Sequence, residues 1–370
     1  MRNNLWRSFL LLAVCIFILL FSSSCFDNSR YTITWIDGDG KVIETKNVVT
    51  LYDPTTRDLP SDTDLWHYTG WMTTNTENGI ICTAKKEKKE HIIWKNSDNE
   101  ILYEVYQVKN SNIQHFDLPQ NDSRWIYEYW EQSTENDTIV FTAKRAPNSN
   151  YFAGNVFQIV TKDTNGDPLS TGSGFVINDE GWFITNDHVM KGATSAVAFF
   201  DIADKANGSR YTQLDILGAV YNSAEKDVFI GKIKDYGTIK QYYNEIKFTE
   251  EYAVGETSYS IGYPNSSTKL EINSGTILDE YSDIYDKING IYYVLSDCYI
   301  APGSSGGILI NEKFEVIGIT SIGLYADTNK QIYEAGGSIP TISFISKLDN
   351  LKESEIMAIT IIYQKGESKK

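Results

Sequence analysis

The stretch Ala301-Pro302-Gly303-Ser304-Ser305-Gly306-Gly307-Ile308-Leu309-Ile310 decides how the rest of the chain is interpreted. It places a hydroxyl inside a glycine-rich turn, and an apolar run follows the turn at once. Glycine adopts backbone conformations that a Cβ forbids, so the N–H groups of such a turn can converge on one point. Acyl transfer needs a nucleophilic oxygen beside N–H donors that face a developing oxyanion. A plain tight turn between two strands has a similar composition, so this stretch alone leaves both interpretations open.

Composition predicts a folded protein and argues against one class of partner. The chain has 370 residues, which suggests two or three domains. It contains 24 Tyr and 8 Trp, residue types that favour strands. Its formal net charge is −16. Because an acidic surface repels phosphate backbones, we expect no nucleic-acid partner.

The N-terminus has the pattern of an export signal. Arg2 and Arg7 flank the start of an apolar run over 9–21, which is shorter than the roughly 20 residues of a membrane span. Ser22-Ser23-Ser24-Cys25 follows and resembles a bacterial lipobox, although Ser22 replaces the usual Leu. We predict a lipoprotein-type signal peptide over 1–24, lipidation at Cys25 and a lipid anchor in a bacterial cell envelope, on the outer membrane and facing the periplasm or the surface. Cleavage with secretion and an uncleaved anchor are the alternatives.

The remaining cysteines do not indicate a disulfide framework. The chain has 4 Cys, which is too few for such a scaffold. Besides Cys15 and Cys25 in the leader, we interpret Cys82 and Cys298 as isolated core thiols, with a bridge between them as the alternative.

Residues 30–147 contain a tandem duplication. Trp35 recurs 59 residues later as Trp94, and several other pairs share this offset: Trp66 and Trp125, Trp71 and Trp130, Leu59-Pro60 and Leu118-Pro119, Thr83-Ala84-Lys85 and Thr142-Ala143-Lys144. Alternating stretches and Asp/Asn/Gly turns predict strands in each copy. The copies, 30–88 and 89–147, resemble the small β-rich repeats of the Listeria–Bacteroides type on bacterial surface proteins. Neither has a His, Cys and carboxylate cluster, so we predict a spacer or a weak binding module.

Short strands separated by turn residues dominate residues 148–350, with one helix expected from Pro340 to about Met357. This spacing predicts an antiparallel barrel or sandwich. His188 lies just past one predicted strand, Asp227 directly precedes another, and Ser305 comes last. The order His, Asp, Ser is that of chymotrypsin-like enzymes and differs from that of subtilisins and α/β-hydrolases. Three other acids compete with Asp227: Asp201, Asp204 and Asp215.

Residues 151 to about 350 resemble a trypsin-like serine protease, in particular the bacterial HtrA (Deg) branch. A series of motifs in the family's order carries this resemblance: 171–177, Ile184-Thr185-Asn186-Asp187-His188-Val189, 254–257 with Ile261-Gly262-Tyr263-Pro264, 296–297 with 301–307, 316–321 and 337–340. Two positions depart from it, because Asp187 replaces an Ala or Asn and Ile308 replaces a frequent Pro. Residues 351–370 are too few for a PDZ domain and are expected to form a C-terminal tail.

The resemblance implies a mainly β protein with a chymotrypsin-like double six-stranded antiparallel β-barrel behind the two repeats. It also implies an acyl-enzyme mechanism. Ser305 would attack the scissile carbonyl, His188 would carry the proton, and Asp227 would orient the imidazole. The N–H groups of Gly303 and Ser305 would form the oxyanion hole.

The resemblance further implies a specificity pocket. It places Tyr299 at the base of the pocket, with Ser321 and Gly323 in its wall. Because no acid stands at the base, we expect small or medium apolar side chains there and no selection for Arg or Lys.

The sequence therefore predicts a membrane-tethered, secreted serine endopeptidase that acts on proteins or peptides without a metal or another cofactor. The main rival is a catalytically silent, protease-like lipoprotein that serves in surface adhesion or binding. A different hydrolase built on the same triad is a third reading. The substrate and the oligomeric state stay open.

Overall fold

The computed structural model describes residues 30–50, 52–204, 208–278, 285–286, 291–325 and 333–364. The predicted signal peptide over 1–24 and Cys25 lie outside these ranges. The chain divides into two compact units. The first extends to Pro119 and includes Tyr129–Lys144, and the second comprises Gln120–Glu128 and the chain from Arg145 onward.

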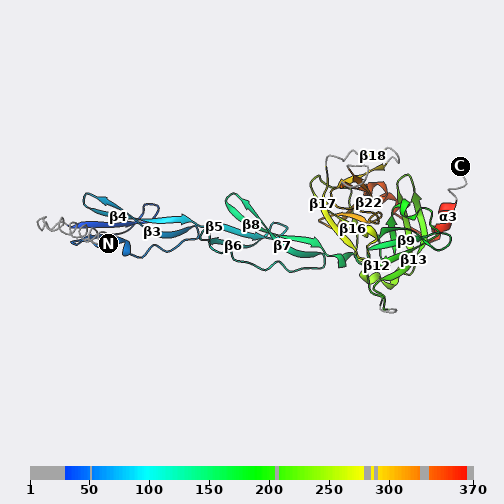
Figure 1. Ribbon diagram of the computed structural model, residues 1–370, viewed down its shortest axis with the longest axis horizontal. Coiled ribbons are helices and arrows are strands. Elements are labelled where there is room, and N and C mark those ends of the chain that lie inside the picture. Colours follow the sequence, from blue (N-terminus) through cyan, green and yellow to red (C-terminus); the bar gives the residue numbers. More distant parts are fainter. Residues whose placement is uncertain are drawn as a thin grey trace, which may run out of the picture. The chain divides into compact units, whose positions relative to one another are not determined.

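Two four-stranded sheets with the same strand order cover residues 31–147. Strands β1 (Tyr31–Ile36), β2 (Val42–Val48), β3 (Trp66–Thr76) and β4 (Gly79–Lys88) form the order β2-β1-β4-β3. Strands β5 (Glu90–Lys95), β6 (Ile101–Gln107), β7 (Trp125–Glu135) and β8 (Thr138–Pro147) form the matching order β6-β5-β8-β7 (Figure 1). In both sheets the first strand pairs parallel with the fourth. Two copies of one sequence unit should fold in this way.

Each sheet buries the tryptophan that opens its sequence copy. Trp35 is 1% exposed and Trp94 is 2% exposed, whereas Trp66 and Trp71 are half-buried. The Arg57 guanidinium lies 5.1 Å from the centre of the Trp35 ring. At the matching place of the second copy, the Phe116 ring lies 4.7 Å from Trp94. The first copy therefore has a cation–π contact where the second copy has an aromatic contact.

Strands of the second unit form two antiparallel barrels. In the first barrel, β12 (Ser195–Phe200), β9 (Val156–Lys162), β10 (Pro168–Val176), β11 (Trp182–Thr185), β14 (Val228–Ile233) and β13 (Thr212–Ser223) follow one another, and β13 pairs back with β12. Inward-facing side chains alternate with outward ones along these strands, and Phe157, Phe183 and Phe229 are completely buried. The ring of six strands is therefore closed around its own core.

The second barrel has the order β17 (Glu271–Thr276), β16 (Thr257–Gly262), β21 (Ile308–Asn311), β22 (Glu315–Tyr325), β23 (Tyr333–Pro340), β20 (Val294–Ser296). A bridge between Ile277 and Ser296 joins its two ends. Strand β15 (Lys247–Phe248) pairs with β22, and β18 (Tyr285–Asp286) pairs with β19 (Ile291–Tyr292). One apolar cluster includes residues of both barrels, such as Phe175 and Ile308. The predicted mainly β fold with two six-stranded barrels is confirmed.

The helix expected from Pro340 to Met357 is absent, and this segment holds only short 3-10 turns. The described helices are α2 (Asp187–Met190) and α3 (Ile359–Gln364), and the 3-10 turns are η1 (Pro54–Thr56), η2 (Ser149–Phe152), η3 (Tyr236–Thr238), η4 (Lys240–Tyr242), η5 (Pro264–Ser266), η6 (Thr341–Ser343), η7 (Ile345–Lys347) and η8 (Glu353–Glu355).

The segment expected to be a tail after residue 350 instead adds a strand to the first barrel and packs in its core. Strand β24 (Met357–Ala358) pairs with β13, and Ile359 is 3% exposed within the core of the first barrel. The close approach requires Gly218, because a Cβ there would lie 2.1 Å from the backbone oxygen of Met357. Burial of Ile359 and pairing of β24 therefore make this segment part of the barrel, and the expected boundary at residue 350 is wrong.

Residues 145–150, around the expected end of the second repeat, also belong to the barrel unit. Trp125 is 7% exposed in the apolar cluster of the barrels, with its ring 4.8 Å from Phe314 and 5.9 Å from Tyr259. The Arg145 guanidinium lies 4.1 Å from the Trp125 ring. Domain boundaries fall where few contacts cross. The predicted boundary at residue 147 instead passes through a packed core.

Two further observations concern the cysteines and the membrane. Cys82 and Cys298 are both buried free thiols, as the sequence predicted. Within the residues described, no helix combines the length and the hydrophobicity that a membrane crossing requires.

Candidate active site

His188 and Asp227 form a close pair. His188 lies in the short helix α2, directly after β11, and Asp227 precedes β14 in a left-handed conformation with φ 51°. One oxygen of the Asp227 carboxylate accepts the backbone N–H of His188 at 2.9 Å, and the other lies 2.8 Å from Nδ1. A carboxylate only accepts hydrogen bonds, so Nδ1 carries the proton. In the neutral ring, Nε2 then has a free lone pair and can act as a base.

The three competing acids lie in other surroundings. Asp201 forms an ion pair with Arg210 at 3.6 Å. The backbone of Asp204 forms a β-bridge with that of Ser209, and Asp215 is exposed on β13. Asp227 is the one of the four whose carboxylate reaches the His188 ring.

Ser321 connects Asp227 to the candidate nucleophile. Its hydroxyl donates to the Asp227 carboxylate at 2.9 Å, and its carbonyl accepts the hydroxyl of Ser305 at 3.0 Å. In this structure the Ser305 hydroxyl therefore donates its hydrogen bond to Ser321. Hydrogen bonds between a nucleophile and its base often tighten only when substrate binds. The sequence predicted Ser321 as pocket wall but not this second role, because the contact joins residues 94 positions apart.

Glycine is required inside the nucleophile turn. Gly306 has φ +87°, and a Cβ there would lie 2.0 Å from the carbonyl oxygen of Ser173. Ser173 holds the turn on two sides, because its N–H donates to the Ser305 carbonyl at 2.7 Å and its hydroxyl donates to the Gly303 carbonyl at 2.7 Å. The segment around Ser173 therefore lies beside the nucleophile turn and is hydrogen-bonded to its backbone.

A contact on Pro302 orients the next peptide group. The N–H of Asn265 donates to the Pro302 carbonyl at 2.6 Å. In a trans peptide the C=O and N–H groups point in opposite directions, so this contact turns the N–H of Gly303 away from Asn265. Within the part of the chain that the structure describes, the N–H groups of Gly303 and Ser305 donate to no protein acceptor. Both donors are free for an oxyanion.

A cavity of about 190 Å³ adjoins Ser305. Ser321 and Gly323 line it as expected, but Tyr299 does not. Tyr299 is 48% exposed, and its ring lies 5.4 Å from that of Tyr333. The assignment of Tyr299 to the base is therefore wrong. Among the described residues, the lining carries no charged side chain and consists of Ile300, Ala301, Pro302, Ser305, Ser321, Gly323 and Tyr325.

Tyr325 is the lining residue that the sequence reasoning missed. A Cβ on Gly323 would lie 3.1 Å from its ring, so the absence of a side chain at Gly323 gives the tyrosine room. The Tyr325 ring also meets that of Tyr333 edge to face at 5.6 Å. The pairing of β22 with β23 brings these rings together, and no local motif signals it.

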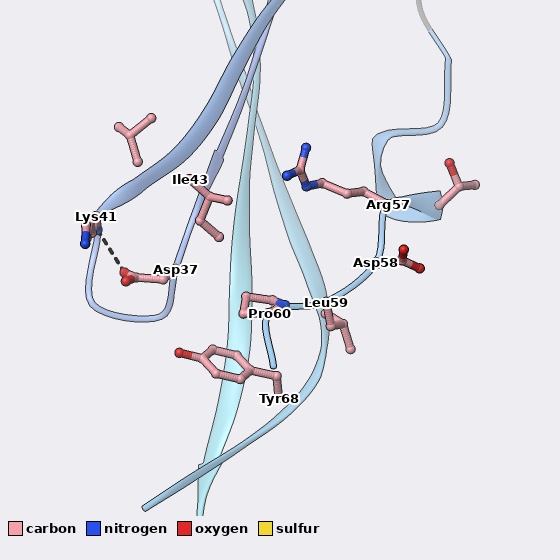
Figure 2. A pocket seen from close by; sticks show the side chains of 10 residues that line it. Asp37, Lys41, Ile43, Arg57, Asp58, Leu59, Pro60 and Tyr68 are labelled. Carbon is pink, nitrogen blue, oxygen red and sulfur yellow. Dashed lines mark hydrogen bonds between the residues drawn. The ribbon is translucent and has the colours of Figure 1, made fainter. Parts of the chain in front are cut away.

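A larger hollow of about 800 Å³ lies in the first repeat. Figure 2 shows Asp37 and Lys41 in the turn after β1, with Arg57 and Asp58 on a neighbouring loop. The hollow is lined by Asp37, Lys41, Val42, Ile43, Thr56, Arg57, Asp58, Leu59, Pro60 and Tyr68. This lining includes neither a histidine nor a serine, so the hollow lacks the groups of the Ser305 site. In the described ranges, no three His, Cys, Asp or Glu side chains gather as a metal site.

A comparison with protein families finds a match over the candidate site. A family model described as "Trypsin-like peptidase domain" matches residues 172–319, a range that contains His188, Asp227 and Ser305. This match covers most of the two six-stranded barrels described above.

Individual relatives of this chain share one printed name. The chain is 27% identical over 185 residues to a protein of Hahella chejuensis called "Probable periplasmic serine endoprotease DegP-like", covering 49% of this chain and 34% of the relative. It is 30% identical over 183 residues to a protein of the same name from Halomonas elongata, covering 49% and 33%. A solved serine endoprotease from Yersinia pestis matches with 22% identity and a TM-score of 0.41, covering 54% and 64%. The chain thus spans about a third of the length of these curated relatives.

Proposed function

We propose that this chain is a serine endopeptidase of the bacterial cell envelope, which cleaves proteins through an acyl-enzyme on Ser305. The observation that carries the proposal is the double hydrogen bond of Asp227 to His188, in the same barrel pair as the glycine-rich turn of Ser305. A protein that only bound a partner would need neither an imidazole with a free Nε2 nor unpaired N–H groups beside a hydroxyl.

Each step of the proposed reaction has a residue in this arrangement. Ser305 Oγ attacks the scissile carbonyl while His188 Nε2 takes its proton. Asp227 stabilises the imidazolium that forms, and the N–H groups of Gly303 and Ser305 stabilise the oxyanion. His188 returns the proton to the leaving amine, and water then releases the acyl group by the same route. Loss of a single oxyanion donor would cost about 3–4 kcal/mol of transition-state stabilisation.

The cavity beside Ser305 supports a preference for small or medium apolar side chains. Its volume of about 190 Å³ exceeds the roughly 150 Å³ of an apolar cavity that holds benzene, and none of the described lining residues carries a charge that would pair with Arg or Lys. A peptide series that differs only at the residue before the scissile bond tests this preference. Alanine and valine peptides should be cleaved faster than lysine peptides.

The proposed location combines the leader with the relatives. Their printed names place them in the periplasm, and the residues before Cys25 resemble a lipobox. We place the mature chain in the envelope, held on a membrane by lipid on Cys25, with the repeats as a spacer between the anchor and the peptidase.

Labelling with a fluorophosphonate probe tests the reaction directly. Wild type should be labelled, and Ser305→Ala should not, because only the activated hydroxyl reacts. Ser274→Ala is a matched control, since Ser274 is an exposed serine on β17 of the same barrel as Ser305. Equal labelling of wild type and Ser305→Ala would contradict the proposal and would favour a binding lipoprotein.

A further inference from the structure

Three consecutive residues end at the candidate catalytic histidine, and Asp227 holds the first and the last of them. The Asn186 side chain donates to the backbone carbonyl of Asp227 at 3.0 Å. His188 is bound by the Asp227 carboxylate. Between them, Asp187 contacts the C-terminal helix α3.

The contact on Asp187 comes from Tyr363. The Tyr363 hydroxyl lies 3.0 Å from Oδ1 of Asp187 and 3.4 Å from its backbone oxygen. The amide of Asn222, on β13, lies 3.4 Å from the same Oδ1. Asp187 is only 3% exposed, so this carboxyl group depends on protein donors instead of water. Neither Asn222 nor Tyr363 belongs to the motifs that suggested the active site.

The C-terminal segment is anchored well enough to hold Asp187 in place. Strand β24 pairs with β13, and Ile359 is buried in the core of the first barrel. Lys232, whose side chain is 8% exposed, forms an ion pair with Glu353 at 2.7 Å. Tyr363 therefore projects from a fixed helix, and its contact joins residues 176 positions apart.

We propose that Tyr363 and Asp187 form a positioning pair that holds the helix carrying His188 and places a second carboxylate on the residue next to it in sequence. This inference rests on the proposed acyl-enzyme function of Ser305 and His188. Tyr363 touches neither the substrate nor the reacting atoms, so its role is to orient the helix of His188 and to tune the charge on Asp187. The proposal makes the C-terminal helix α3 part of the active site.

The charges around Asp187 determine the direction of the effect. Burial raises the pKa of Asp187 above its usual value, the hydroxyl of Tyr363 and the amide of Asn222 lower it again, and the charge of Asp227 raises it while that of Lys191 lowers it. An ionised Asp187 favours the protonated form of the neighbouring imidazole. Removal of this charge should therefore move the titration of the imidazole to lower pH.

Two conservative variants isolate the pair. Asp187→Asn keeps an acceptor for Tyr363 but removes the charge. Tyr363→Phe keeps the ring but removes the donor, which leaves Asp187 neutral over a wider pH range. Tyr243→Phe is the matched control, because this half-buried tyrosine of the same unit donates instead to the backbone of Ile177 at 3.0 Å. Thermal unfolding of each variant verifies that it folds.

The first readout is the titration of the imidazole by NMR, which needs no activity. The chain has 4 His, and the other three lie in the repeats, so His188→Gln identifies the signal. The titration midpoint should fall in Asp187→Asn. It should fall by less in Tyr363→Phe and not at all in Tyr243→Phe. In the Asp187→Asn background, Tyr363→Phe should add no further shift, since no charge remains to be tuned.

The second readout is the rate of fluorophosphonate labelling over about pH 5 to 9, which brackets the usual range of histidine. Tyr363→Phe should lower the plateau rate by about tenfold, because a misplaced base loses alignment, and Tyr243→Phe should not. An unchanged midpoint in Asp187→Asn, or equal effects of Tyr363→Phe and Tyr243→Phe, would overturn the positioning role. Failure of wild type to label would instead refute the proposed function, and the NMR titration would still decide the role of the pair.

Discussion

Trp125 offers the sharpest test of where the barrel unit begins. Its indole is 7% exposed among residues of both barrels, although its sequence belongs to the second repeat. Truncation of a buried Trp to Ala costs about 3–5 kcal/mol. The Arg145 guanidinium over its ring adds about 0.5–2 kcal/mol of cation–π attraction, which the same substitution removes. We therefore expect Trp125→Ala to destabilise the barrels by about 3–5 kcal/mol or slightly more.

The duplication supplies a matched control for this experiment. Trp66 occupies the equivalent position in the first repeat, where it is half-buried and Lys86 Nζ lies 4.2 Å from its ring. Trp66→Ala should leave the barrel unit unchanged, because Trp66 belongs to the other unit.

The assay must report on the barrels alone, since two units need not unfold together. Hydrogen exchange of peptides from β16 and β21 over a urea series gives the midpoint and slope for this unit. Trp125→Ala should lower the midpoint at an unchanged slope. A loss below about 1 kcal/mol, or an equal loss in Trp66→Ala, would refute the inference that the tip of the second repeat completes the barrel core.

Four other predictions concern stability, the active turn and the anchor. Because burial raises the pKa of Asp187, the folded state binds more protons than the unfolded chain, and stability is lost as pH rises through the window above 3.8. Asp187→Asn should therefore stabilise the protein at neutral pH in urea titrations, with no gain below that window. Gly306→Ala should abolish fluorophosphonate labelling, because its Cβ would meet Ser173 and the left-handed backbone adds about 1–3 kcal/mol of strain. Residues 148–370 expressed alone should unfold at a lower temperature than residues 89–370, because the shorter chain lacks Trp125, which packs in the barrel core. Cys25→Ser should lose labelled fatty acid and leave the detergent phase, whereas retention there without acylation would indicate an uncleaved anchor.

Much of the architecture follows from patterns between neighbours along the chain. The alternation of apolar residues and the turn residues between them predicted the strands of both barrels, because each strand places successive side chains on opposite faces. The 59-residue offset between Trp35 and Trp94 predicted two equivalent units, and both tryptophans are buried in sheets of the same order. The order of His188, Asp227 and Ser305 likewise selected one class of active site before any distance was known.

The tertiary structure decided what depends on contacts between distant segments. Tyr325 lines the cavity in place of Tyr299, because the pairing of β22 with β23 determines which ring faces Ser305. Trp125 joins the barrels and Tyr363 reaches Asp187 for a similar reason. Tyr363 and Asp187 are 176 residues apart, and they meet because burial of apolar surface in the closed barrel determines which segments pack together. The local periodicity of the sequence carries no information about such a contact.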